Sequence, residues 1–138
     1  MTEIEDQFQA AIEQYKGGAP VPELIPTFKD ICQRAQKSSS AWTCLAWLYL
    51  LDEKPHQAYK AAQRAVKLNP EDPQARINLA MAMLETGKKG VRPHIELAQT
   101  IVNAVPELRQ EVTDNFADGL SRKPEWDSLQ RLQMLVLG

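Results

Sequence analysis

The chain has 138 residues, of which 43% are hydrophobic, so it is long enough to fold around a substantial core as a single domain. Its 16 basic and 18 acidic residues give a net charge of −2, which argues against a protein that captures nucleic acid through a basic field. The first residues are acidic rather than signal-like, and the longest apolar run, residues 41–51, is too short to span a bilayer, so we expect a cytoplasmic protein without membrane insertion.

Helical periodicity continues along the whole chain, and no strand-like alternation interrupts it. Prolines and glycines mark the breaks, and Ser38 to Ser40 supply hydroxyl groups for capping the apolar helix that begins near Ala41. Where a proline follows a break in the helical periodicity, it lies at a position where a new helix can begin. The predicted helices span about residues 3–16, 22–37, 41–51, 55–68, 74–86, 92–105, 107–120 and 125–137.

The helices repeat in pairs at an offset of 34 residues. At this offset Ala11 aligns with Leu45 and Leu79, and the other aligned columns of the first helices are also mostly apolar. In the second helices, the large apolar residues of the first unit align with Ala58, Ala62 and Ala65 of the second. The sequence therefore predicts three successive helix pairs that shield one another.

The middle unit resembles the tetratricopeptide repeat (TPR), whose pattern is W-x2-L-G-x2-Y, then A-x3-F, then P. Trp42, Leu45, Ala46 and Tyr49 follow the first part of this pattern, and Ala58, Ala62 and Pro70 follow the rest. The resemblance implies an all-α fold, a right-handed helical-repeat solenoid of three TPR-like helix pairs plus two C-terminal helices. The repeats would cover about residues 5–38, 39–72 and 73–106, and the capping helices about 107–120 and 124–137.

The resemblance also implies that the first helices of the pairs line a concave face. Several side chains at the corresponding positions are apolar, including Trp47 as a central anchor, and together they form a strip larger than an unpartnered surface usually exposes. We therefore expect a groove that binds a peptide or an amphipathic helix of a protein partner. The predicted groove residues are Thr43, Trp47, Leu50, Ile77, Asn78, Met81 and Leu84.

The sequence also allows other interpretations of the apolar strip. The segment 125–137 contains Trp126, Leu129 and Leu132 and could fill the groove from within, or pair with a second copy in a homodimer. The chain could also be an accessory subunit of a larger complex, with its groove permanently occupied. An RNA-binding helical repeat is disfavoured, because such repeats read bases with polar selectors and a basic face.

No arrangement of residues predicts catalysis, a metal site or a cofactor. Cys32 and Cys44 lack metal-ligand or redox spacing and are interpreted as small core residues. His56 and His94 have no serine, cysteine or carboxylate at triad or ligand spacing. We therefore expect a non-enzymatic adaptor or scaffold that needs no cofactor.

Overall fold

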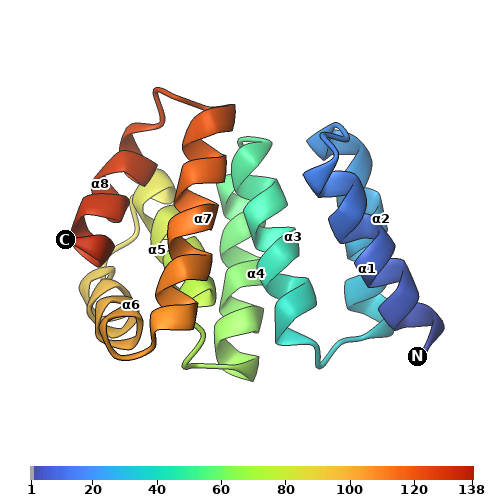
Figure 1. The fold of residues 1–138 in the computed structure, drawn as a ribbon, viewed down its shortest axis with the longest axis horizontal. Helices are drawn as coiled ribbons and strands as arrows, with labels where there is room; N and C mark the ends of the chain where they lie inside the picture. The colour runs from blue at the N-terminus through green and yellow to red at the C-terminus, as the bar shows by residue number, and fades with distance from the viewer. Residues whose placement is uncertain (1) are drawn as a thin grey trace.

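The computed structural model describes residues 2–138, and all of the regular structure within that range is helical (Figure 1). The all-α, helical-repeat fold expected from the sequence is confirmed. The helices are α1 (Glu3–Lys16), α2 (Val21–Arg34), α3 (Ser39–Leu51), α4 (Pro55–Leu68), α5 (Pro73–Thr86), α6 (Arg92–Ala104), α7 (Pro106–Arg122) and α8 (Asp127–Leu137).

Local chemistry explains where several helices begin. The side chain of Ser38 accepts a hydrogen bond from the Ala41 backbone amide, so α3 begins two residues earlier than the sequence predicts. Asp72 caps α5 in the same way through the amide of Gln74. Pro55 and Pro106 each occupy the first position of a helix, where no backbone donor is needed.

The first six helices form three antiparallel hairpins, α1–α2, α3–α4 and α5–α6, which stack side by side (Figure 1). Small residues make the central contacts close: Ala58, Ala62 and Ala65 of α4 are completely buried. Because alanine adds almost no bulk, the α4 backbone can approach α3 and α5 near the short end of the usual range of about 8–10 Å. The alanine stripe therefore has the packing role that the sequence predicts.

The two C-terminal helices do not simply continue this stack. Helix α8 packs against α5, α6 and α7, and α7 lies in front of α5 across the inner face of the array (Figure 1). In the middle of the array, α3 packs along α5. Toward the N-terminus, α1 is separated from α3. The inner face is therefore covered over its C-terminal part, and an opening remains between α1 and α7.

Candidate functional site

Most of the apolar strip predicted as an open groove is covered. Leu50, Ile77, Asn78 and Met81 are at most 1% exposed, and Thr43 is 8% exposed. Trp47 and Leu84 are half-buried. The expectation that all seven residues lie on one accessible surface is therefore corrected, because α7 and α8 of the same chain pack onto Leu50, Ile77 and Met81.

Two segments provide the cover. Helix α7 contributes Val112, Phe116 and Gly119, and α8 with the turn before it contributes Trp126 and Leu129. The ring centroids of Trp47 and Trp126 are 5.7 Å apart, in a tilted arrangement. The alternative that segment 125–137 fills the groove from within is thus partly right, and α7 supplies the other part.

A polar cluster joins the C-terminal end of α7 to α1. The hydroxyl of Tyr15 accepts a hydrogen bond from Trp47 Nε1 at 2.8 Å and donates one to the Asp118 carboxylate. Arg122 forms an ion pair with Asp118 at 3.1 Å, and its guanidinium lies 4.2 Å from the centre of the Tyr15 ring. Burial, with a contribution from Asp118, raises the pKa of the Tyr15 hydroxyl, which therefore keeps its proton for this contact.

A second polar chain joins α7 to α5 and α3. Asn115 donates to the side-chain oxygen of Gln74 at 3.0 Å, and Gln74 donates to Asn78 at 2.8 Å. Asn78 in turn donates to the backbone oxygen of Thr43 at 3.0 Å. The buried Asn78 amide therefore already has both a donor and an acceptor partner inside the protein, which satisfies a group that burial would otherwise destabilise.

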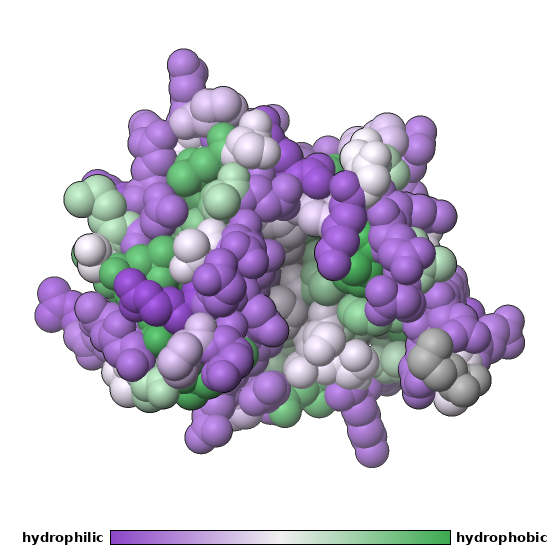
Figure 2. Space-filling model, viewed as in Figure 1, coloured by the Kyte–Doolittle hydropathy of each residue, from purple (hydrophilic) through white to green (hydrophobic). Residues whose placement is uncertain are grey.

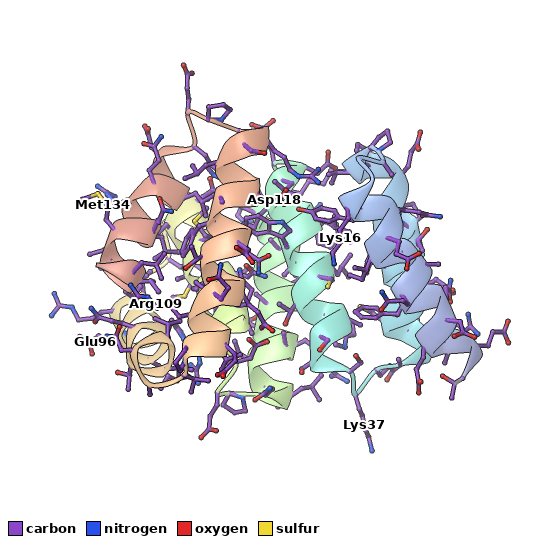
Figure 3. All side chains as sticks on the ribbon, in the orientation of Figure 1. Lys16, Lys37, Glu96, Arg109, Asp118 and Met134 are labelled. Atoms are coloured by element: carbon purple, nitrogen blue, oxygen red, sulfur yellow. The ribbon has the colours of Figure 1, made fainter. Side chains whose placement is uncertain are left out.

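The uncovered part of the inner face is a cleft of about 180 Å³ that is lined by α1, α2, α3, α5 and α7. In the space-filling view the surface is hollowed between the α1 side and the α7 side (Figure 2). Ile12, Phe28 and Leu48 contribute apolar wall, and Thr43 and Trp47 also line the space. We call this space the inner cleft; Figure 3 shows Lys16 and Asp118 on the two sides of its opening.

The wall of the inner cleft includes a cysteine thiol beside apolar and amide side chains. Cys44 lines it, but burial raises the pKa of the Cys44 thiol to about 12, so the nucleophilic thiolate is scarce at neutral pH. Over residues 2–138, no group of three or more histidine, cysteine, aspartate or glutamate side chains is placed to hold a metal ion. In the same range, every helix is too short or too polar to cross a bilayer.

Sequence reasoning missed the residues of α7 that complete this site. The sequence places Asn115, Asp118 and Gly119 only in a capping helix, and Arg122 in the turn after it. The available signal was a single glycine one turn after Phe116, which permits close helix packing but does not identify the surface that is approached.

Stacked helix pairs with a hollowed inner face define a helical-repeat protein. The tetratricopeptide repeat model matches residues 39–82, which span α3, α4 and most of α5. Residues 39–82 are therefore similar to tetratricopeptide repeats, and a curated relative supports the same resemblance.

One curated relative is the peroxisomal targeting signal receptor of Candida albicans, which is 25% identical over 83 residues. That match covers 60% of this chain but only 14% of the receptor, so the chain corresponds to a small part of the receptor's length.

Solved structures share the fold over most of the chain. The type III secretion translocator chaperone SycD of Yersinia enterocolitica, in an alternative dimer, has a TM-score of 0.69 at 16% identity, over 95% of this chain and 92% of that one. A type III secretion complex from Aeromonas hydrophila has a TM-score of 0.70 at 18% identity, over 90% of this chain and 83% of that one. At such identities the likeness describes the fold alone.

Proposed function

We propose that this chain is a non-catalytic adaptor that binds a short apolar segment of a protein partner in the inner cleft. The observation that carries the proposal is the cleft itself: apolar walls on α1, α2 and α3 face a rim that includes Lys16, Gln74 and Asn115. Binding sites for peptides commonly combine an apolar hollow with a few polar groups that fix orientation. The names of the similar proteins, a translocator chaperone and a targeting signal receptor, support recognition of another polypeptide.

Within this proposal, the predicted groove residues have different roles. Thr43 and Trp47 line the inner cleft and would contact the partner. Asn78 orients Gln74 at the rim through its hydrogen bond. Leu50, Ile77 and Met81 belong to the core beneath α7 and α8, and the half-buried Leu84 lies outside the inner cleft.

The packing of α7 and α8 over the apolar strip argues against the accessory-subunit interpretation. An apolar strip that is buried by α7 and α8 does not need a permanent partner to shield it from water. A free cytoplasmic adaptor is therefore our preferred proposal. Light scattering on the purified chain tests it: an accessory subunit should form large, heterogeneous aggregates when alone, whereas the adaptor should give a defined monomer or dimer.

Affinity capture from the native host tests the inner cleft. Ile12→Glu places a charge on the cleft wall at a half-buried position, and Ala10→Glu adds the same charge at an exposed position of the same helix. We expect partners to bind the wild type and Ala10→Glu alike and to bind Ile12→Glu at least about tenfold more weakly. A photo-crosslinker at Lys16 should attach to an apolar segment of the same partner.

Circular dichroism must show that both variants keep their helices. If Ile12→Glu is folded and retains every partner with unchanged affinity, the inner cleft is not the binding site. Trp47→Glu is unsuitable for this purpose, because Trp47 packs against Gly119 and Trp126 and its loss would disturb the fold.

A further inference from the structure

A second hollow lies on the other side of α3, between α2 and α4. It has a volume of about 520 Å³ and is separate from the inner cleft. Trp42, Leu45 and Tyr49 of α3 line it, and these positions recur at the i, i+3, i+7 spacing of one helix face. Thr43 and Trp47, which line the inner cleft, lie on the opposite face of the same helix.

We call this second hollow the basic groove. Its rim is positively charged on both walls. Lys29 comes from α2, and Lys60 and Arg64 come from α4. Among residues 2–138, no aspartate or glutamate lines the groove. None of the three cations forms an ion pair within residues 2–138, although the chain as a whole carries a net charge of −2.

Nearby acidic groups have other partners. Asp30 follows Lys29 in α2, but its carboxylate contacts Arg34 at 3.5 Å and Gln7 at 3.2 Å. Asp52, at the end of α3, pairs with Lys54 at 2.9 Å. The positive charge on the two walls is therefore not neutralised by these carboxylates.

The floor of the basic groove is apolar and partly aromatic. The indole of Trp42 is held in place, because its Nε1 donates to the backbone oxygen of Gln36 at 3.0 Å and Arg64 lies 5.7 Å from the ring centre. Ala61 is 4% exposed and lines the space, so a small side chain leaves the hollow open between the two walls. Tyr49 is half-buried at the same site.

We propose that the basic groove binds an acidic segment of a partner protein. One apolar or aromatic side chain of that segment would lie on the floor, and flanking carboxylates would reach Lys29 on one wall and Lys60 on the other. Charge complementarity supports this occupant, because the groove presents cations on both sides of an apolar floor without competing acids. Three cations are too few for tight binding of a polyphosphate backbone, which argues for protein over nucleic acid.

The proposal does not depend on the inner cleft. Because the two sites lie on opposite faces of α3, one molecule could hold two polypeptides at once, which would make the adaptor a scaffold. Binding at the basic groove and binding at the inner cleft can be lost separately. Ile12→Glu should leave binding at the basic groove unchanged.

The test uses a fluorescein-labelled peptide in which leucine and phenylalanine are flanked on both sides by glutamates. Lys29→Glu combined with Lys60→Glu reverses one exposed charge on each wall, and Lys89→Glu with Arg131→Glu makes the same charge change at exposed positions elsewhere. Binding is measured by fluorescence anisotropy and located by amide chemical shifts. A matched peptide with glutamines in place of the glutamates reports the contribution of charge.

We expect the acidic peptide to shift amides of α2 and α4 and to bind the wall variant at least about tenfold more weakly. The distant double variant should bind within about twofold of the wild type, and added salt should weaken binding. Three results would overturn the proposal: no shifts at α2 and α4, an equal loss in both double variants, or tighter binding of single-stranded oligouridine at the same amides. Circular dichroism of both double variants confirms that each is folded.

Discussion

Gly119 of α7 lies directly against the indole ring of Trp47 in α3. A Cβ atom built on Gly119 would be 2.8 Å from Cη2 of Trp47 and 2.6 Å from Cδ2 of Leu129, distances that real Cβ contacts essentially never show. Only glycine permits α7 to approach the inner face so closely. This contact determines how much of the inner face is covered and where the inner cleft begins.

Gly119→Ala should therefore destabilise the protein, even though alanine favours helix. Forcing a methyl group into a packed contact typically costs about 1–3 kcal/mol. Urea unfolding followed by circular dichroism measures the change in the free energy of unfolding. Ser121→Ala, at an exposed position of the same helix, should stay within about 0.5 kcal/mol of the wild type. Equal stability of Gly119→Ala and the wild type would show that α7 does not pack on Trp47.

Tyr15→Phe should weaken the contact between α1 and α7. The substitution leaves Trp47 Nε1 without its acceptor and Asp118 without its hydroxyl donor, which should cost about 1–3 kcal/mol. Tyr59→Phe is the matched control, because the Tyr59 hydroxyl accepts only an exposed hydrogen bond from Gln63. Hydrogen exchange should show faster exchange in α7 for Tyr15→Phe alone. Unchanged exchange in α7 would show that the tyrosine hydroxyl does not hold the two helices together.

Removal of residues 123–138 should unfold or aggregate the chain. Trp126, Leu129, Leu132 and Val136 are each at most 7% exposed. At about 1.5–3 kcal/mol for each buried side chain, their loss approaches the total stability of about 5–15 kcal/mol typical of a domain. Circular dichroism and light scattering check the result. A truncated chain that stays folded and monomeric would mean that α8 is a removable lid.

Acid should destabilise the packing of α5 against α6 through His94. Burial, aided by the Arg76 guanidinium 2.9 Å from Nδ1, lowers the pKa of His94 below its usual value near 6.5. The unfolded chain then binds a proton more readily than the folded one, so stability is full above about pH 6.5 and falls as the pH decreases below it. Thermal unfolding between pH 7.5 and 5 should show this decrease in the wild type and a smaller one in His94→Gln. His56→Gln replaces the chain's other histidine at an exposed site and is the matched control.

The homodimer expected through the C-terminal helix stays a prediction. On α8, Met134 and Leu135 are 74% and 48% exposed, and burial of this apolar pair would favour self-association. Met134→Glu combined with Leu135→Glu should shift sedimentation from dimer to monomer without changing the helix content. Wild-type protein that sediments as a monomer at high concentration would contradict the prediction.

The sequence by itself determined the helices and their pairing. Prolines at first helix positions and the small residues of α4 act over one or two turns, so their consequences can be inferred without knowledge of distant contacts. The periodic match around Trp42, Leu45 and Ala46 also identified the repeat, because stacked units need similar residues at similar positions.

Only the tertiary structure decided what lies on the inner face. The apolar side of α7 had to be buried somewhere, but periodicity does not specify the surface that buries it. Gly119 lies 72 positions after Trp47 in the chain, and Asp118 and Tyr15 are 103 positions apart, so no local pattern links these pairs. Likewise, Lys29 and Lys60 share one groove because α2 and α4, which belong to different repeats, both pack against α3, and that proximity is a property of the folded array.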